Sequence, residues 1–474
     1  MTPRREFFGF WLVALATTLA IAPAGPSYWD SFGYAAQSVT GQVGGLALGR
    51  PLFIFIGHQL VRLALGLGAD VAFLEPMLRY FWTALAALSA PMMWLLADSL
   101  GLSRSASRWA ALCVALSPAM AHTSGQVLTD GPTVAMVLAS TWFAVRAGRE
   151  GALSLWAGAG VMFGAAIVFR EPSVAHGLVL AGLVLVAKPG TRLKGALIAT
   201  IAGLAFAGVW VAWAAQQPGW VDSVRNWVSE MQRERLDHPY TARDFTMYLV
   251  WLVTLGPVML VAGVIGWARA KQTFAGSSRA VVVIAAGSLV QLLMLGGYQD
   301  IVLAPRYLLG AMPGALALVA GLTLAAWART PLRVRALAGV MVTLAVISAV
   351  GVKWKEAPLR EALDTTGARL SHEETPLVLV TGQACPQVEL LQTLERMRSA
   401  EAAQRVSGWK RVCYGWSWPR DLGATLQQHL DAGEYVIADL RDAVWPGDRQ
   451  QAAKRELEAW LATTHDPRVR VWRE

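Results

Sequence analysis

Apolar runs long enough to cross a lipid bilayer recur along most of the first 350 residues. Hydrophobic residues make up 55% of the 474-residue chain and charged residues only 15%, a composition that excludes an ordinary soluble enzyme. A spanning helix needs about 20 largely apolar residues, so the sequence predicts an α-helical polytopic membrane protein with about 11 transmembrane helices. The runs lie near residues 7–24, 78–98, 107–122, 131–147, 153–169, 173–187, 195–214, 247–268, 280–296, 307–328 and 336–352.

Basic residues gather in every second connection between these runs. Cytoplasmic loops carry an excess of Lys and Arg, so this alternation predicts a cytoplasmic N-terminus. With an odd number of spans, everything after about Lys353 is then expected on the outer, non-cytoplasmic side of the membrane. The formal charge of +9 is explained by membrane orientation, and nucleic acid is not expected as a partner. The basic residues are Arg4, Arg5, Arg104, Arg108, Arg146, Arg149, Lys188, Arg192, Lys194, Arg269, Lys271, Arg279, Arg329, Arg333 and Arg335.

Two of the connections expected outside are longer than a simple turn. The first, about 25–77, contains the apolar stretch 52–67, which His58 and Arg62 interrupt. Charges inside the stretch favour a helix lying in the membrane interface, and a twelfth span is the alternative. The second, 216–246, mixes Trp and Tyr with acidic and basic residues. That mixture indicates an amphipathic helix at the level of the lipid headgroups.

The remainder, 353–474, has the composition of a small soluble α/β domain. Strands are expected at 377–380, 412–416 and 435–440, with helices at 387–401 and 449–461. Cys385 and Cys413 lie in this tail and pair if it faces an oxidising compartment; two unrelated buried thiols are the alternative. The stretch 416–421, WSWPRD, is interpreted as a tryptophan-packed turn, with sugar stacking as the second interpretation. The chain is thus expected to contain a membrane module, 1–352, and an extracytoplasmic domain, 353–474.

Asp30 is the acidic residue best placed for chemistry outside the membrane. It follows the first apolar run and is flanked by Tyr28, Trp29 and Phe32. Aromatic neighbours partly desolvate a carboxylate, which then accepts a proton more readily from a hydroxyl group. The alternative is an Asp that only caps a turn.

Five further features follow Asp30 in order on the expected outer side. Tyr34 comes four residues after Asp30, Arg50 precedes Pro51 and an apolar helix, and Leu78-Arg79 opens the second span. The segment 124–132, SGQVLTDGP, places Asp130 before the next span, and 304–309, APRYLL, with Pro313 lies near a late span. This order resembles the GT-C superfamily of polyprenyl-phosphate-sugar-dependent glycosyltransferases, in its aminoarabinose-transferase and protein-mannosyltransferase-like branch. The resemblance covers roughly the first 350 residues.

The resemblance implies an inverting glycosyltransferase of the bacterial inner membrane that works on the periplasmic side. Its donor is a polyprenyl-phosphate-linked sugar, and its acceptor is a lipid, a glycan or a protein. Asp30 is then the catalytic base and Asp130 lies on the acceptor or cation side. The donor phosphate is bound by Arg306, Arg50 and Arg170, although Glu171 is a ready partner for Arg170. The supporting residues are Tyr34, His58 and Tyr307.

The sequence departs from the family pattern beside Asp30. Many members have a second acid there, whereas this chain has Ser31. No cofactor is therefore assigned, and if a divalent metal takes part, Asp30 and Asp130 are its expected ligands. Two other classes suit a chain with many spans: a secondary transporter, and a lipid-linked polysaccharide ligase or polymerase. The absence of an internal repeat and the long first outer connection favour the transferase over the transporter.

Overall fold

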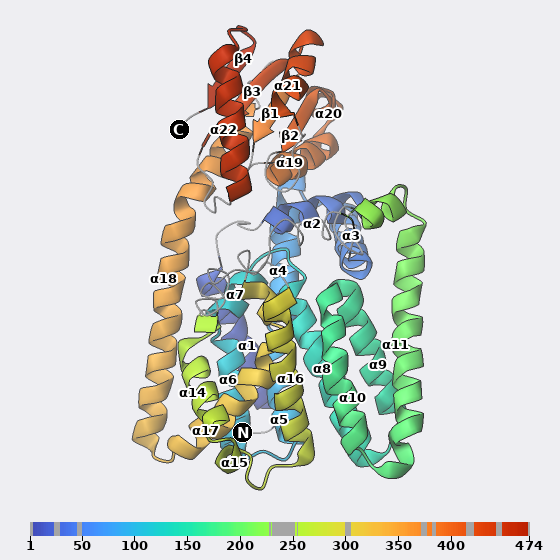
Figure 1. Ribbon diagram of the computed structural model, residues 1–474, viewed down its shortest axis with the longest axis vertical. Helices are drawn as coiled ribbons and strands as arrows, with labels where there is room; N and C mark the ends of the chain where they lie inside the picture. Colours follow the sequence, from blue (N-terminus) through green and yellow to red (C-terminus); the bar gives the residue numbers. More distant parts are fainter. Residues whose placement is uncertain are drawn as a thin grey trace. The chain divides into compact units, whose positions relative to one another are not determined.

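The computed structural model shows a largely helical chain with one small sheet (Figure 1). It describes residues 3–22, 29–44, 50–226, 229, 252–253, 255–298, 305–370, 377–381, 385–413, 421–441 and 448–472. Two compact units divide the chain. Unit 1 comprises residues 1–24, 41–60 and 77–354, and unit 2 comprises residues 25–40, 61–76 and 355–474.

Unit 1 is a bundle of helices built from the predicted apolar runs. Every one of those runs contains at least one described helix, because a helix satisfies the polar groups of its backbone within a single apolar segment. The elements that lie wholly or partly in unit 1 are α1 (Pro3–Ile21), α3 (Pro51–Gly66), α4 (Leu74–Ala86), α5 (Ser89–Ser99), α6 (Arg104–Ala115), α7 (Pro118–Ser124), α8 (Asp130–Glu150), α9 (Leu153–Phe169), η2 (Glu171–His176), α10 (Gly177–Val186), α11 (Arg192–Ala215), α14 (Pro257–Ala268), α15 (Ala270–Thr273), α16 (Arg279–Tyr298), η5 (Pro305–Leu308), η6 (Pro313–Ala317), α17 (Leu318–Trp327) and α18 (Pro331–Leu370).

Prolines break two of the runs that the sequence treats as single spans. Pro118 separates α6 from α7, because proline lacks the amide hydrogen that would continue the helix. Pro313 begins η6, a short π-helical turn that leads into α17. Both breaks shorten the individual helices and bring irregular backbone into the bundle.

Three described helical segments are long and apolar enough to cross a membrane: Val71–Ser99, Pro189–Ala215 and Pro331–Gly351. Six shorter apolar helices of 10–17 residues accompany them. The predicted number of about 11 spans is therefore not confirmed. The last long segment belongs to α18, which continues without interruption to Leu370.

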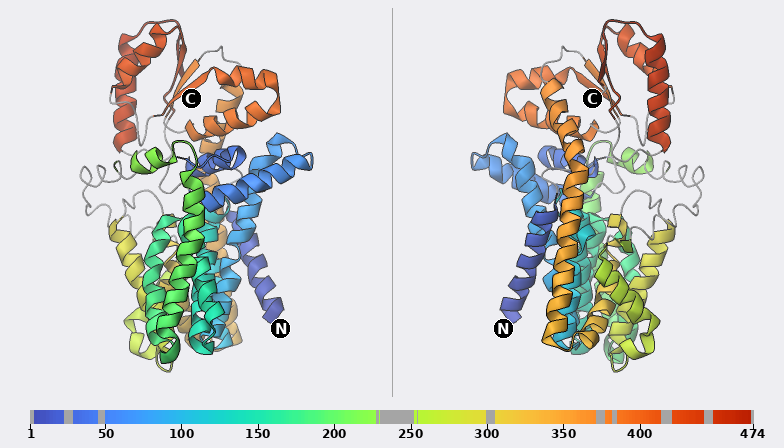
Figure 2. Two further views of the ribbon diagram at one scale, coloured as in Figure 1. Left: turned by 90° about the vertical axis from the view of Figure 1, so that its right-hand side faces the viewer. Right: turned by 90° about the vertical axis from the view of Figure 1, so that its left-hand side faces the viewer.

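Glycine permits a close helix crossing in unit 1. In the Gly160-x-x-x-Gly164 motif of α9, a Cβ atom at Gly160 would lie 2.0 Å from the carbonyl oxygen of Ala199 on α11. One at Gly164 would lie 2.5 Å from the carbonyl oxygen of Gly203. Small residues let apolar helices pack backbone to backbone, and α9 and α11 run side by side in Figures 1 and 2.

A buried carboxylate joins the start of the chain to α6. The Glu6 side chain is 3% exposed and forms ion pairs with Arg104 and with Arg108, whose Nη2 atom lies 2.7 Å from Glu6 Oε1. The beginnings of α1 and α6 therefore lie at one end of the bundle. This arrangement agrees with the charge alternation, which assigns both segments to one side of the membrane; that this side is cytoplasmic remains a prediction.

Unit 2 contains a four-stranded parallel sheet in the order β2-β1-β3-β4. The strands are β1 (Leu377–Thr381), β2 (Trp409–Cys413), β3 (Tyr435–Asp439) and β4 (Val469–Trp472). One face packs Leu377, Leu379 and Ile437 against α19 (Cys385–Arg398), α20 (Ala400–Ser407) and the end of α18. The other face packs Val378, Val436 and their neighbours against α21 (Leu422–Asp431) and α22 (Asp448–Thr463). A helix layer on each face is the expected arrangement for a parallel sheet.

The predicted tail elements agree with the structure in kind but not in every boundary. The strands predicted at 377–380 and 435–440 correspond to β1 and β3, and the two helices to α19 and α22. The strand predicted at 412–416 is shifted, since β2 runs from Trp409 to Cys413 and pairs in parallel with β1. Residues 414–420, with most of the tryptophan-packed turn, and 230–246, with most of the predicted amphipathic helix, lie outside the described residues.

A disulfide bond joins Cys385 at the start of α19 to Cys413 at the end of β2. The two Cα atoms are 5.8 Å apart, and 28 positions separate the cysteines in the sequence. Of the two alternatives left open by the sequence, the structure has the paired one. Disulfides persist in oxidising compartments, as expected for an extracytoplasmic tail.

Glu434, at the start of β3, makes the tail domain sensitive to acid. Burial would raise the pKa of this carboxyl, but hydrogen bonds from Lys410 and His429 outweigh burial and lower the pKa below its ordinary 4.5. A lowered pKa contributes stability above the ordinary value, and that contribution disappears as the pH falls through the pKa of the folded state.

We expect Glu434→Gln to speed amide hydrogen exchange in β3 at pH 7, with a smaller effect at about pH 3, where more of the wild-type carboxyl is protonated. Exchange measured on the full-length protein at both pH values tests this expectation. Glu458→Gln, at an exposed position of α22, is the matched control and should leave β3 exchange unchanged. An equal effect of Glu434→Gln at both pH values would contradict the prediction.

Candidate functional site

Arg50 has a backbone conformation that side chains rarely adopt. Its φ angle is +49°, and it is the only non-glycine residue with positive φ in the described part of the chain. The following residue is Pro51, the first residue of α3, and the Arg50 carbonyl accepts a hydrogen bond from the Ile54 amide at 3.1 Å. Strained backbone of this kind costs of the order of 1–3 kcal/mol and often occurs at functional sites. Arg50 is thus held in place by the turn that starts α3.

The Arg50 side chain is nearly buried and faces an acid across a loose ion pair. It is 11% exposed, and its Nη2 atom lies 3.6 Å from Oε2 of Glu171, whose side chain is 21% exposed. This distance allows electrostatic attraction but is too long for a good hydrogen bond. A stronger anionic ligand has the geometry to compete with Glu171 for this guanidinium.

Arg170 and Asp130 form a second, tighter ion pair. Arg170 follows the last residue of α9 in extended conformation, and Asp130 lies in the first turn of α8, where the helix dipole favours a carboxylate. Their side chains are 7% and 1% exposed. Glu171 pairs with Arg50, and the acid that pairs with Arg170 is Asp130, 40 positions earlier, rather than its neighbour in the sequence.

A buried aromatic cluster positions the two arginines. The Phe53 ring stacks on Trp82 with centroids 4.0 Å apart, and Phe169 contacts both rings at 5.7 and 5.8 Å. All three residues are fully buried. Phe53 lies one turn after Arg50 and Phe169 directly precedes Arg170, so the cluster ties α3, α4 and α9 together next to the charges.

A polar contact anchors the far end of η2, the short helix that begins at Glu171. His176 Nε2 lies 2.8 Å from Thr141 Oγ1 of α8, and Gln291 of α16 is also close to the histidine. His176 and Gln291 are both buried. Sequence analysis missed these residues and the aromatic cluster; the available signal was polar side chains within apolar runs, which identifies buried positions but not their partners.

His58 packs on a glycine. A Cβ atom at Gly41, where φ is +74°, would lie 3.0 Å from the imidazole ring. Gly41 follows α2 (Trp29–Thr40). Only glycine satisfies both the positive φ and this close approach, so His58 has a structural contact in unit 1, and its predicted supporting role stays a prediction.

Arg306 lies in η5, which packs against α7 and α16. Its side chain is half-buried. The motif that pointed to Arg306 is only partly described, since residue 304 lies outside the described residues and the structure does not describe the Tyr307 side chain. Binding of the donor phosphate by Arg306, and support from Tyr307, remain predictions.

Asp30 and Tyr34 lie one turn apart on α2, a helix that the sequence did not predict. Both belong to unit 2, where α2 packs against α19 of the tail domain. Tyr34 is buried and Asp30 is half-buried. The tail domain therefore supports the helix that carries the predicted catalytic base. A meeting of Asp30 with Asp130 or with the arginines of unit 1 remains a prediction.

Asp30 and Asp130 are the residues predicted to bind a divalent metal, if one takes part. Within the described residues, no group of three or more His, Cys, Asp or Glu side chains has the arrangement of a metal site. The Asp130 carboxylate is almost fully buried against Arg170, and a carboxylate engaged by a guanidinium is a poor ligand for a divalent cation.

Residues 68–213 match the family model described as dolichyl-phosphate-mannose-protein mannosyltransferase. This confirms the resemblance to the GT-C glycosyltransferases over just under a third of the chain, a segment that includes Asp130, Arg170 and Glu171. The fold is similar to the crystal structure of ArnT from Cupriavidus metallidurans bound to undecaprenyl phosphate, with 13% sequence identity and a TM-score of 0.48; the alignment covers 96% of this chain and 76% of ArnT. No curated protein sequence matches the chain.

Proposed function

We propose that this protein is an inner-membrane glycosyltransferase that moves a sugar from a polyprenyl-phosphate donor to a lipid, glycan or protein acceptor on the periplasmic side. The observation that carries the proposal is the arrangement around Arg50: a nearly buried guanidinium on strained backbone, with a loosely held counter-ion. That counter-ion, Glu171, belongs to the segment that matches the dolichyl-phosphate-mannose-protein mannosyltransferase family model.

In this scheme Arg50 binds the phosphate of the donor. Without donor, Glu171 neutralises the guanidinium, which avoids the large cost of an isolated buried charge. When donor binds, its phosphate replaces Glu171 and forms shorter, charge-assisted hydrogen bonds. The same contacts stabilise the charge that develops on the phosphate as the bond to the sugar breaks. Arg306 is the second cation proposed for this task.

Asp30 acts on the acceptor. Its carboxylate accepts the proton of the acceptor hydroxyl while the hydroxyl oxygen attacks the anomeric carbon. The bond between that carbon and the phosphate oxygen breaks, and polyprenyl phosphate leaves with the electron pair. A single displacement of this kind inverts the anomeric centre. The disulfide in the tail supports a periplasmic location, because this bond persists under oxidising conditions.

The direct test is to incubate the purified protein with a panel of polyprenyl-phosphate sugars and to measure release of polyprenyl phosphate. A folded preparation that neither binds nor consumes any lipid-linked donor would overturn the proposal. A donor carried without cleavage would favour a secondary transporter instead.

Arg50 provides a sharper version of this test. We expect Arg50→Ala to lower kcat/KM for the donor by about 10- to 100-fold, because a hydrogen bond to a charged group contributes about 1.5–3 kcal/mol. Arg50→Lys should recover only part of the loss, since lysine keeps the charge but not the two-pronged geometry. Arg62→Ala, at an exposed position of α3, the helix that follows Arg50, is the control and should behave like the wild type. Equal kcat/KM values for Arg50→Ala and Arg62→Ala would exclude Arg50 as the phosphate ligand.

A further inference from the structure

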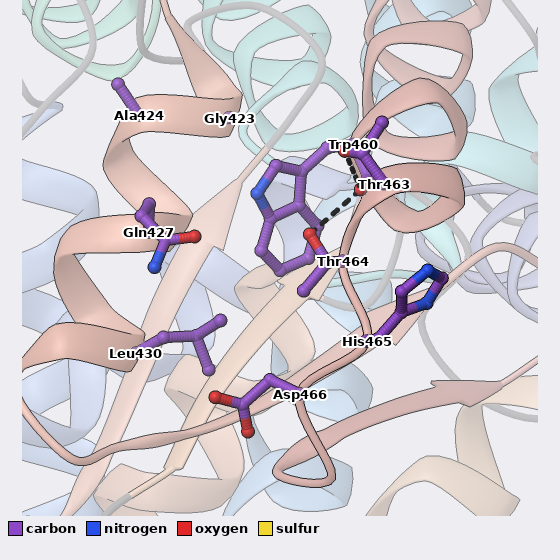
Figure 3. Close-up of a pocket in the computed structure, with 9 residues that line it drawn as sticks. All are labelled: Gly423, Ala424, Gln427, Leu430, Trp460, Thr463, Thr464, His465 and Asp466. Carbon is purple, nitrogen blue, oxygen red and sulfur yellow. Dashed lines mark hydrogen bonds between the residues drawn. The ribbon is translucent and has the colours of Figure 1, made fainter.

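The tail domain contains a polar hollow on the face of the sheet that α21 and α22 cover. It has a volume of about 450 Å³ and lies between α21 and the end of α22. Figure 3 shows the Trp460 indole between Gln427 of α21 and Thr464 just after α22. The lining residues are Gly423, Ala424, Gln427, Leu430, Trp460, Thr463, Thr464, His465 and Asp466.

The hollow combines a tryptophan ring with hydrogen-bond donors and acceptors. Trp460 is half-buried, with its ring packed on the domain core, while Gln427 and Thr463 are exposed. Gly423 leaves space beside the ring: a Cβ atom there would already lie 3.3 Å from Trp460 Cδ1. A larger residue would press on the indole, so glycine helps to keep this side of the ring open.

Hydrogen bonds fix the walls of the hollow. The Arg468 side chain binds both carboxylate oxygens of Asp466, at 3.0 and 2.6 Å, and donates to the Leu430 carbonyl at 2.7 Å. It thereby ties the turn after α22 to the end of α21. The hydroxyl groups of Thr463 and Thr464 each donate to the Trp460 carbonyl at 2.9 Å. A site held in this way loses little conformational freedom when a ligand binds.

The chemistry of the lining narrows the class of ligand. Asp466 is an anion already engaged by Arg468, and no Lys or Arg among the described residues lines the hollow, so phosphates and nucleotides are poorly matched. Amide and hydroxyl groups around the ring equally disfavour a purely apolar ligand. A neutral saccharide presents hydroxyl groups at its edge and C–H groups on its face, which match the polar rim and the indole.

We infer that this hollow binds a neutral saccharide. The inference rests on the proposed function in one respect: in the proposed transferase, the bound saccharide would be the glycan part of an acceptor. Held in the tail domain, it would be bound by the same domain that supports α2, the helix of Asp30.

The test uses full-length protein in lipid nanodiscs and neutral disaccharides as probes: cellobiose, maltose, mannobiose and chitobiose at millimolar concentration. Binding is followed by saturation-transfer NMR. We expect at least one disaccharide to bind. Trp460→Ala should weaken that binding by about tenfold or more, because the ring contact and its buried area are lost together.

Two neighbouring glutamines on α21 can be substituted as a matched pair without disturbing the domain core. Gln427 lines the hollow and Gln428 does not, and both are exposed. We expect Gln427→Ala to weaken binding by about three- to tenfold, as for a lost neutral hydrogen bond, and Gln428→Ala to have no effect. The inference is overturned if no probe binds the wild type or if the two glutamine variants bind equally well.

Donor cleavage with water as acceptor, measured on the same preparations, separates this inference from the proposed function. Donor cleavage without saccharide binding would remove only the saccharide site. Saccharide binding without cleavage of any donor would count against the transferase and leave the binding site in place.

Discussion

Replacing Asp30 by asparagine is expected to lower the turnover of a polyprenyl-phosphate sugar by about 10²- to 10⁴-fold, the contribution typical of a general base. Asparagine keeps the size of the side chain but does not accept the proton of the attacking hydroxyl. Donor binding should change little, because the phosphate is assigned to arginines on other elements. The measurement is kcat for release of polyprenyl phosphate, together with the donor Kd on the same preparation.

The matched control for this prediction is Asp70→Asn. Asp70 lies in the same predicted outer connection, is exposed, and accepts a hydrogen bond from the Ala72 amide at 2.7 Å. Asparagine caps such a turn as well as aspartate does, so the control variant should keep full turnover. Wild-type kcat in Asp30→Asn would leave Asp30 with the structural role of a residue in the first turn of α2.

The helical conformation of the apolar runs was predictable from the sequence because each helix depends on local composition alone. An apolar run satisfies its backbone within one helix wherever it packs, so 153–169 was expected as a helix and α9 has those bounds. The number of spans was less accessible, since a single proline such as Pro118 divides a run that average hydropathy treats as continuous. The helix α2 was missed because its sequence, with Gly33 and several polar residues, has no strong helical pattern; its packing against α19 stabilises it.

The site residues were identifiable singly, whereas their partners were not. Arg50, Asp130 and Arg170 stand out as charges next to apolar runs, where each must have a counter-charge or a function. Which acid meets which arginine depends on how α3, α8 and α9 pack, and no spacing in the sequence specifies that. The pairing of Arg170 with Asp130 also changes the interpretation of Arg170. Because its guanidinium is already engaged, we propose that it positions η2 and Glu171 rather than binding the donor phosphate itself.

This structural role predicts a large loss of stability when Arg170 alone is replaced. Arg170→Met leaves the Asp130 carboxylate, 1% exposed, without its ion-pair partner. Breaking a buried pair in this way costs about 3–5 kcal/mol of unfolding free energy. The double variant Arg170→Met with Asp130→Leu removes both charges and should recover most of that loss. Unfolding by denaturant in detergent solution measures the unfolding free energies of the wild type, of Arg170→Met and of the double variant.

An exposed ion pair on α8, the helix that contains Asp130, is the control for these stability measurements. Arg146 Nε lies 2.7 Å from Glu150 Oε1, with side chains 38% and 46% exposed, and such surface pairs contribute about 0–1 kcal/mol. Arg146→Met should therefore unfold nearly like the wild type. Donor affinity then distinguishes the two roles of Arg170: a positioning residue predicts a stable double variant with near-normal donor Kd, because Arg50 still holds the phosphate. A stable double variant that no longer binds donor would instead identify Arg170 as a direct ligand of the phosphate.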